Sequence, residues 1–271
     1  MSFQVRVLGC GEAFDGSGLG NTSFLLESKR HPSLLVDCGY QVPERLWRNN
    51  RHQKLDAVCF THLHGDHALG IVPLLTRFWE EKRTRSLDMI GPRGTEKWIS
   101  SALQLGYPGM LKKLPFDLHF RVLEANRPLE LQLGTSEIRM QGARTTHSVL
   151  NHAIRFELPQ GRSFSVSGDG QITSDVCRLV SGVDLHFQEC FWRKPRAPSH
   201  ADLVTLRAAW QGEWGATAPR SIVLTHVSRY ERAGLTRDWA KLTKVDPRWK
   251  LAEPDQVYRL GGASRKNSSN R

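Results

Sequence analysis

Short apolar runs separated by polar or glycine-containing breaks predict that the chain opens with consecutive β-strands. The runs have strand length and are rich in Val, Ile, Leu and Phe. They cover residues 3–8, 23–26, 34–37 and 57–60. Similar runs recur at residues 118–123, 129–140, 153–158, 163–167, 183–187 and 222–224. Strands are therefore expected along most of the chain.

Between these strands, apolar residues recur at the spacing of helices with one buried face. The segments are 71–81, 95–105, 174–180, 201–210 and 236–242, and Thr95 is a candidate N-cap. Because strands and helices are interleaved, the pattern indicates an α/β protein. No linker divides the chain, so we expect a single domain over residues 1–260. Residues 261–271, rich in Gly, Ser, Asn and basic residues, are expected to form a disordered tail.

Composition excludes several classes of protein. Hydrophobic residues make up 39% of the 271 residues, which excludes wholesale disorder. No apolar stretch reaches the roughly 18 residues of a membrane span, and the N-terminus lacks the pattern of a secretory signal. The five cysteines show no CxxC spacing, which indicates reduced thiols in the cytoplasm rather than a disulfide scaffold. A net charge of +11 would favour an anionic partner such as nucleic acid.

One segment carries histidine and aspartate at the density of a metal site. It reads Thr61-His62-Leu63-His64-Gly65-Asp66-His67 and joins the strand at 57–60 to the helix at 71–81. His62 and His64 can point the same way from extended backbone, and the following turn brings Asp66 and His67 towards them. These ligand types suit zinc, or manganese or iron, and the lack of thiolate argues for an open, catalytic site. The alternative, that the histidines only cap a turn, would leave buried polar groups unpaired.

Three later residues, His147, Asp169 and His226, each lie at or just after the end of an apolar strand. Taken singly, each is as readily a turn residue. Together they indicate a shared site, because residues at successive strand ends can converge on one edge of a sheet.

The order of these motifs resembles the metallo-β-lactamase superfamily, and within it the ribonuclease Z branch. Besides the histidine motif, the resemblance rests on residues 7–11, 35–39, 90–94, 188–190 and 224–230. It implies an α/β fold that is a four-layer αββα sandwich with two metal ions at one edge. By position, one metal would be held by His62, His64 and His147. The other would be held by Asp66, His67 and His226, and Asp169 would bridge the two.

Three more residues match positions of the family. Asp37 is similar to a carboxylate that orients a ligand histidine. Glu189 and His200 are similar to a pair that delivers a proton, although the family has a hydroxyl residue where Ala201 stands here. The alternatives are a capping role for Asp37 and a capping or surface role for His200.

The resemblance implies a hydrolase that cleaves phosphodiester bonds with two Zn²⁺ ions, Mn²⁺ or Fe²⁺ being alternatives. The substrate would be the 3′ end of precursor tRNA, in the cytoplasm, and homodimers are common in the family. Asp66 would orient the attacking water, while His200, supported by Glu189, would protonate the leaving oxygen. Candidate phosphate contacts are Lys112, Lys113, Arg193, Lys194 and Arg196.

Several alternative functions stay open at this point. Ribonuclease Z proteins usually carry a long flexible arm before the bridging aspartate, whereas His147 and Asp169 are only 22 positions apart. Small-molecule or cyclic-nucleotide phosphodiesters therefore remain candidate substrates. Related hydrolases of thioesters and lactones use a similar histidine motif, and a non-catalytic RNA-binding module would keep the same fold.

Overall fold

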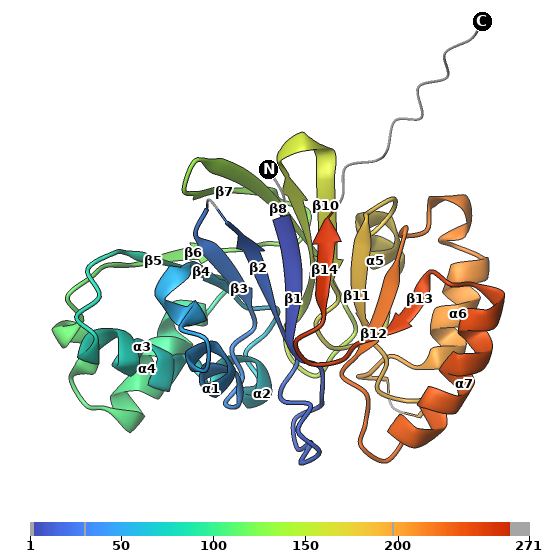
Figure 1. Cartoon of the computed structure of the whole chain (residues 1–271), viewed down its shortest axis with the longest axis horizontal. Coiled ribbons are helices and arrows are strands. Elements are labelled where there is room, and N and C mark those ends of the chain that lie inside the picture. The colour runs from blue at the N-terminus through green and yellow to red at the C-terminus, as the bar shows by residue number, and fades with distance from the viewer. Residues whose placement is uncertain (1–2, 30, 197, 261–271) are drawn as a thin grey trace, which may run out of the picture.

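Two β-sheets packed face to face form the centre of the computed structural model, which describes residues 3–29, 31–196 and 198–260 (Figure 1). In spatial order, the seven strands of the first sheet are β14 (Val257–Leu260), β1 (Phe3–Gly9), β2 (Ser23–Ser28), β3 (Ser33–Val36), β4 (Leu55–Cys59), β5 (Leu87–Gly91) and β6 (Leu118–Val122). The seven of the second are β13 (Trp249–Leu251), β12 (Ile222–Thr225), β11 (Leu185–Glu189), β10 (Arg162–Val166), β9 (His152–Leu158), β8 (Ser136–Arg144) and β7 (Leu129–Leu133). The tail predicted at 261–271 lies outside the described residues.

Helices cover the outer face of each sheet (Figure 1). The first sheet is covered by α1 (Val42–Trp47), α2 (Gly65–Ala68), α3 (Ile71–Glu80) and α4 (Thr95–Gly106). The second is covered by α5 (Ser174–Leu179), α6 (Leu203–Gln211) and α7 (Arg232–Val245). Short 3₁₀ turns occupy Arg51–Lys54, Met110–Lys113, Pro159–Gly161 and Gly215–Thr217. The predicted four-layer αββα sandwich is confirmed.

The core explains why several strands have unbroken apolar sequences. On β2, Phe24 and Leu26 point into the layer between the sheets, while Leu25 points outwards towards the helices. The middle of such a strand is buried on both faces, which favours apolar side chains at consecutive positions. Between the sheets, the rings of Phe24 and Phe187 lie 4.2 Å apart, which ties β2 to β11.

The element boundaries differ from the sequence prediction in several places. The single strand predicted at 129–140 is two strands, β7 and β8, because the chain turns at Gly134 with a φ of 60°. Thr95 is not the N-cap of α4; Gly94 takes that position, and the Thr95 hydroxyl donates to the carbonyl oxygen of Pro92. Helix α7 begins four residues before the predicted segment, and α1, β13 and β14 were not predicted.

The carboxyl ends of the strands that carry the candidate site lie at the same edge of the sandwich. Strands β3 and β4 are parallel, and so are β10, β11 and β12. Strand β8 runs in the direction of β10, because both pair antiparallel with β9. This topology collects the residues that follow these strands. None of the helices in the described ranges is long and apolar enough to cross a membrane.

Candidate metal centre

The residues after β4 supply four candidate ligands. The backbone stays extended up to His64, with φ −66° and ψ 156°, and α2 begins at the next residue. This conformation places His62 and His64 on the same side, with ring centroids 4.9 Å apart. The first turn of α2 then directs Asp66 and His67 to the same space, as the sequence predicted.

One group of candidate ligands consists of His62, His64 and His147, each with a nitrogen within 4.8 Å of the others. His147 follows β8, and its Nε2 lies 3.2 Å from Nδ1 of His64. The other nitrogen of His147 lies 2.7 Å from the carbonyl oxygen of Ser199, which fixes the ring. Three imidazole nitrogens facing one another suit a divalent cation.

The second group consists of Asp66, His67, Asp169 and His226, all of them buried. Nε2 of His67 and Nε2 of His226 are each 3.3 Å from Oδ2 of Asp66, and 3.3 Å from one another. His226 follows β12 with a left-handed backbone, φ 53°, which is uncommon outside glycine. Backbone from the two sheets therefore meets at this group.

Asp169 lies between the two groups. Its Oδ1 is 3.4 Å from Nε2 of His67, and its Oδ2 is 3.9 Å from Nε2 of His62. Gly168 precedes it with φ +60°, and a Cβ there would stand 2.3 Å from the amide oxygen of Asn151. Asn151 in turn donates from Nδ2 to the Asp169 carbonyl oxygen at 2.6 Å. Asn151 was not singled out from the sequence, since a lone asparagine in a loop carries no spacing signal.

Some donor atoms of the candidate ligands have no hydrogen-bond partner within the protein and would be satisfied by a metal ion. Nε2 of His62 and Oδ1 of Asp169 are buried and have no hydrogen-bond partner in the part of the chain that the structure describes. Buried polar atoms are rarely left unpaired, and each would be satisfied by a cation. Nitrogen and oxygen donors without thiolate are typical of zinc and also accept manganese or iron.

The electrostatics of the centre differ from one candidate ligand to the next. Burial, followed by the charge of His67, holds the pKa of His62 well below its usual range, so this imidazole is neutral. Burial alone would raise the pKa of Asp169, but the facing imidazoles of His226 and His67 hold that pKa well below its usual range. Burial alone would lower the pKa values of His67 and His226, but the carboxylates of Asp169 and Asp66 raise both above their usual range, so a metal ion that binds here would displace protons from these two imidazoles.

Asp37 contacts the candidate ligand His67 on the side of the ring that faces away from the other ligands. Its Oδ2 lies 2.8 Å from Nδ1 of His67 and also accepts a 2.8 Å hydrogen bond from the Thr61 hydroxyl. Its Oδ1 accepts the backbone N–H of Thr61 at 2.8 Å. These contacts orient His67 with Nε2 towards the other candidate ligands, which is the arrangement that the resemblance implied.

Glu189 and His200 form a pair at the rim of the centre. Glu189, at the end of β11, is fully buried, and its Oε1 lies 2.5 Å from Nδ1 of His200. Its Oε2 accepts backbone N–H groups from Gly170 and Ala201, at 2.6 and 3.1 Å. A nitrogen of His200 lies within 4.8 Å of donor atoms of both His147 and Asp169. The imidazole therefore reaches the space between the candidate ligands and solvent.

A pocket of about 490 Å³ opens onto these residues. Aromatic side chains form much of its wall: Phe14, Phe191, Trp192 and Tyr230. Arg229 lies between the exposed rings of Phe14 and Tyr230 and pairs with the buried carboxylate of Glu12. Neither Phe14 nor Glu12 was singled out from the sequence, because both lie in the loop after β1, far along the chain from the histidine motif.

Two of the basic residues proposed to contact phosphate already have acidic partners. Arg193 pairs with Asp238 at 2.8 Å, and Arg196 pairs with Glu231 at 2.9 Å. Their positive charge is therefore largely balanced within the protein.

Comparisons with known proteins identify the family and the fold of the chain. Residues 3–227 match the model of a family described as "Anti-Pycsar protein Apyc1". A ribonuclease Z of Lachnoclostridium phytofermentans is 32% identical over 136 residues, which span 49% of this chain and 41% of that protein. The uncharacterized protein Rv1339 of Mycobacterium tuberculosis is 27% identical over 232 residues, 84% of this chain and 81% of its own.

Among solved structures, the metallo-β-lactamase fold protein YhfI from Bacillus subtilis superimposes with a TM-score of 0.76. The two share 22% sequence identity, and the superposition covers 96% of this chain and 100% of YhfI. The predicted metallo-β-lactamase fold is confirmed.

Proposed function

The chain belongs to the family described as Anti-Pycsar protein Apyc1 and is a metal-dependent hydrolase, and from this premise we propose that the bond it hydrolyses is a phosphodiester. The observation that carries the proposal is the position of the Glu189–His200 pair beside the cluster of candidate ligands. A group placed to give a proton is needed when the leaving group is a strongly basic alkoxide, as in nucleotides.

His62, His64 and His147 would hold one metal ion, Asp66, His67 and His226 a second, and Asp169 both. Two Zn²⁺ ions are the preferred pair, with Mn²⁺ or Fe²⁺ as alternatives. Such a pair supplies Lewis-acid polarisation of the phosphoryl group and a water of lowered pKa.

The protein's own residues orient the reactants and move the protons. Asp66 Oδ2 faces both His67 and His226, so its carboxylate can accept a hydrogen bond from the attacking water and direct it at phosphorus. On the other side, Glu189 holds Nδ1 of His200 and so directs Nε2 of that ring towards the pocket. Nε2 then donates a proton to the leaving oxygen as the ester bond breaks.

We further propose that the substrate is a small or cyclic phosphodiester of nucleotide size. The pocket volume of about 490 Å³ suits one nucleotide, and the aromatic walls suit a base. Strands β9 and β10 fill the segment between His147 and Asp169 and leave no long arm there to grip tRNA. Precursor tRNA is the second candidate, favoured by the net charge of +11 and by the ribonuclease Z relative.

Parallel assays of the metal-loaded protein test these proposals. The substrates are a 3′,5′-cyclic nucleotide, a 2′,3′-cyclic nucleotide, a precursor tRNA and an acyl thioester, with metal content measured on the same sample. We expect turnover of a cyclic nucleotide and loss of that turnover in Asp66→Ala. Cleavage of tRNA alone would select the second candidate, and turnover of the thioester alone would reject phosphodiester chemistry. RNA binding without any turnover would reject an enzymatic role.

A further inference from the structure

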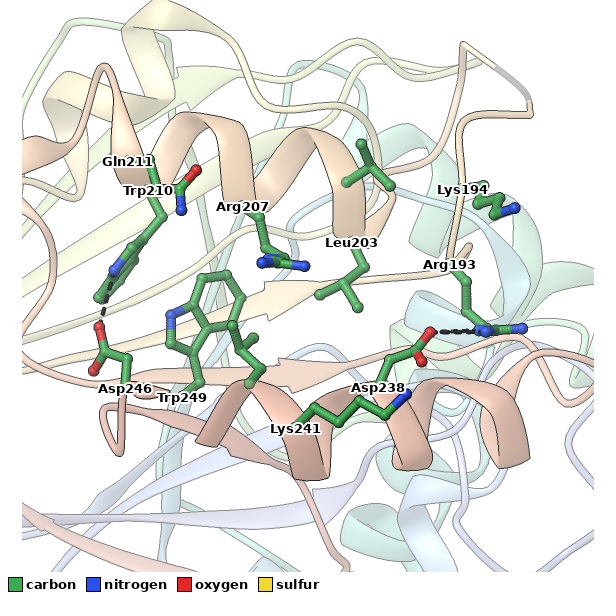
Figure 2. A pocket seen from close by; sticks show the side chains of 12 residues that line it. Arg193, Lys194, Leu203, Arg207, Trp210, Gln211, Asp238, Lys241, Asp246 and Trp249 are labelled. Atoms are coloured by element: carbon green, nitrogen blue, oxygen red, sulfur yellow. Dashed lines mark hydrogen bonds and ion pairs between the residues drawn. The ribbon is translucent and has the colours of Figure 1, made fainter. Parts of the chain in front are cut away.

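A second hollow, as large as the active-site pocket, lies between helices α6 and α7 (Figure 2). Its volume is about 500 Å³, within the range of about 300–1,000 Å³ that small-molecule sites occupy. None of its lining residues is a candidate metal ligand or a wall residue of the active-site pocket. It is therefore a separate feature, which we call the α6–α7 groove.

The interior of the groove is apolar and aromatic. Leu203 and Trp210 contribute from α6, Leu242 from α7, and Trp249 from β13. The rings of Trp210 and Trp249 lie 5.1 Å apart at one end of the groove (Figure 2). The indole N–H of Trp249 is buried and has no hydrogen-bond partner among the described residues. Trp249 is only 1% exposed, so the accessible aromatic surface at this end belongs to Trp210, against which a flat ring could stack.

The rim of the groove carries positive charge without matching negative charge. Of its two acidic residues, Asp238 is paired with Arg193 at 2.8 Å, and Asp246 with Arg248 at 2.7 Å. Three further cations, Lys194, Arg207 and Lys241, form no ion pair with any residue of the described ranges. Figure 2 shows Arg207 and Lys241 on the two facing helices and Lys194 beyond them.

We propose that the α6–α7 groove binds a small aromatic phosphate monoester. The ring would lie against Trp210 and Leu242, and the phosphate would accept hydrogen bonds from Arg207 and Lys241, with Lys194 nearby. Three unpaired cations suit a phosphate dianion, since charge-assisted hydrogen bonds are stronger than neutral ones. The apolar interior gives a hydrophobic contact that inorganic phosphate cannot use, so ring and phosphate are both required.

The groove lies next to the segment that carries His200. The backbone N–H of Leu203 donates to the carbonyl oxygen of Trp192 at 3.0 Å, and Trp192 lines the active-site pocket. The two hollows thus share the chain from Trp192 to Leu203, but each has its own lining side chains.

Calorimetric titration of the metal-loaded protein with adenosine 5′-monophosphate tests the proposal, with adenosine and inorganic phosphate as partial probes. Amide hydrogen exchange locates the bound nucleotide. We expect protection in residues 203–211 and 238–249, and at least tenfold weaker binding of adenosine and of phosphate. The double variant Arg207→Glu/Lys241→Glu should weaken binding at least tenfold. The matched control Arg237→Glu/Lys244→Glu changes two exposed cations of α7 outside the groove and should change binding less than twofold.

The proposal is overturned if the groove variant binds the nucleotide as tightly as the parent, or if protection is confined to the metal centre. It is also overturned if no nucleotide binds at millimolar concentration, or if adenosine binds equally well. The milder variant Arg207→Gln and the turnover of bis(p-nitrophenyl) phosphate report whether the fold is intact. If the groove variants bind the nucleotide more weakly but still turn over bis(p-nitrophenyl) phosphate at the parent rate, the result supports a binding site in the groove. This outcome does not depend on whether a cyclic nucleotide is the substrate of the metal centre.

Discussion

Replacing His200 with alanine should slow the hydrolysis of phosphodiesters with a basic alkoxide leaving group far more than that of phosphodiesters with a p-nitrophenolate leaving group. The side chain is held by the buried carboxylate of Glu189 at 2.5 Å and by stacking on Phe191, with ring centroids 4.4 Å apart. The ring centroid of His147 lies 5.2 Å from that of His200, but His147 is one of the candidate metal ligands. Among the described residues that line the pocket, His200 is the one imidazole outside the seven candidate ligands, so most of the contribution of acid catalysis should be lost.

Acid catalysis by a positioned side chain contributes about 10²–10⁴-fold in rate, or about 3 to 5 kcal/mol of barrier. His200→Ala should therefore lower kcat for a cyclic nucleotide, whose leaving group is a basic alkoxide, by about that factor. The p-nitrophenolate group leaves without a proton, so kcat for bis(p-nitrophenyl) phosphate should fall by less than about tenfold. The ratio of the two losses is the quantity to measure.

His119→Ala is the matched control, because it removes an exposed imidazole on β6, far from the centre. Metal content must be measured for each variant, since a nitrogen of His200 also lies near the candidate ligands. Equal losses on the two substrates at full metal content would refute the acid role and leave His200 a structural residue. Full activity on the cyclic nucleotide would refute it equally.

Three other substitutions test the support of the centre and the core. Asp37→Asn should weaken metal binding about 10–100-fold, measured by chelator competition, because it loosens the hold on His67; unchanged affinity would contradict that role. Gly39→Ala should cost about 1–3 kcal/mol in urea unfolding and lower turnover, because the new Cβ would stand 1.9 Å from the backbone oxygen of Asp66. Burial lowers the pKa of His186 from 6.5 to about 4, so the unfolded chain takes up its proton first as pH falls. The free energy of unfolding should drop by about 3 kcal/mol from pH 7 to pH 4 through this residue, and His186→Gln should remove that part of the pH dependence.

Much of the fold could be predicted because hydrophobic patterning reflects burial directly. The strand at 57–60 and the helix at 71–81 have clear periods, and both are present at nearly the predicted bounds. The strand β14 was not predicted, because only four residues pair with β1 and they lie between polar segments. Helix α1 was missed because it is only six residues long. Elements this short are decided by tertiary contacts rather than by their own sequence pattern.

The residues of the candidate site likewise fall into those that the sequence could predict and those that it could not. The dense motif around His62 predicts a metal site by itself, since residues that are close in sequence must also be close in space. His147 and His226 are 79 positions apart, and only their place after strands connected them to that motif. Asn151 and Glu12 had no such marker, because their roles depend on loops whose path the sequence does not specify.

Backbone strain at two positions shows what the sequence alone could not reveal about how the sheets meet. Asp37 and His226 both adopt left-handed backbone, with φ of 61° and 53°, which costs of order 1–3 kcal/mol each for residues other than glycine. At His226 the strain is offset by contacts between the sheets, because its N–H donates to the carbonyl oxygen of Cys10 at 2.9 Å. The next residue, Val227, forms a β-bridge with Gly11. The ends of β1 and β12 are thereby joined beside the candidate ligands, so the same hydrogen bonds that close this edge of the sandwich also aim His226 at Asp66 and Asp169.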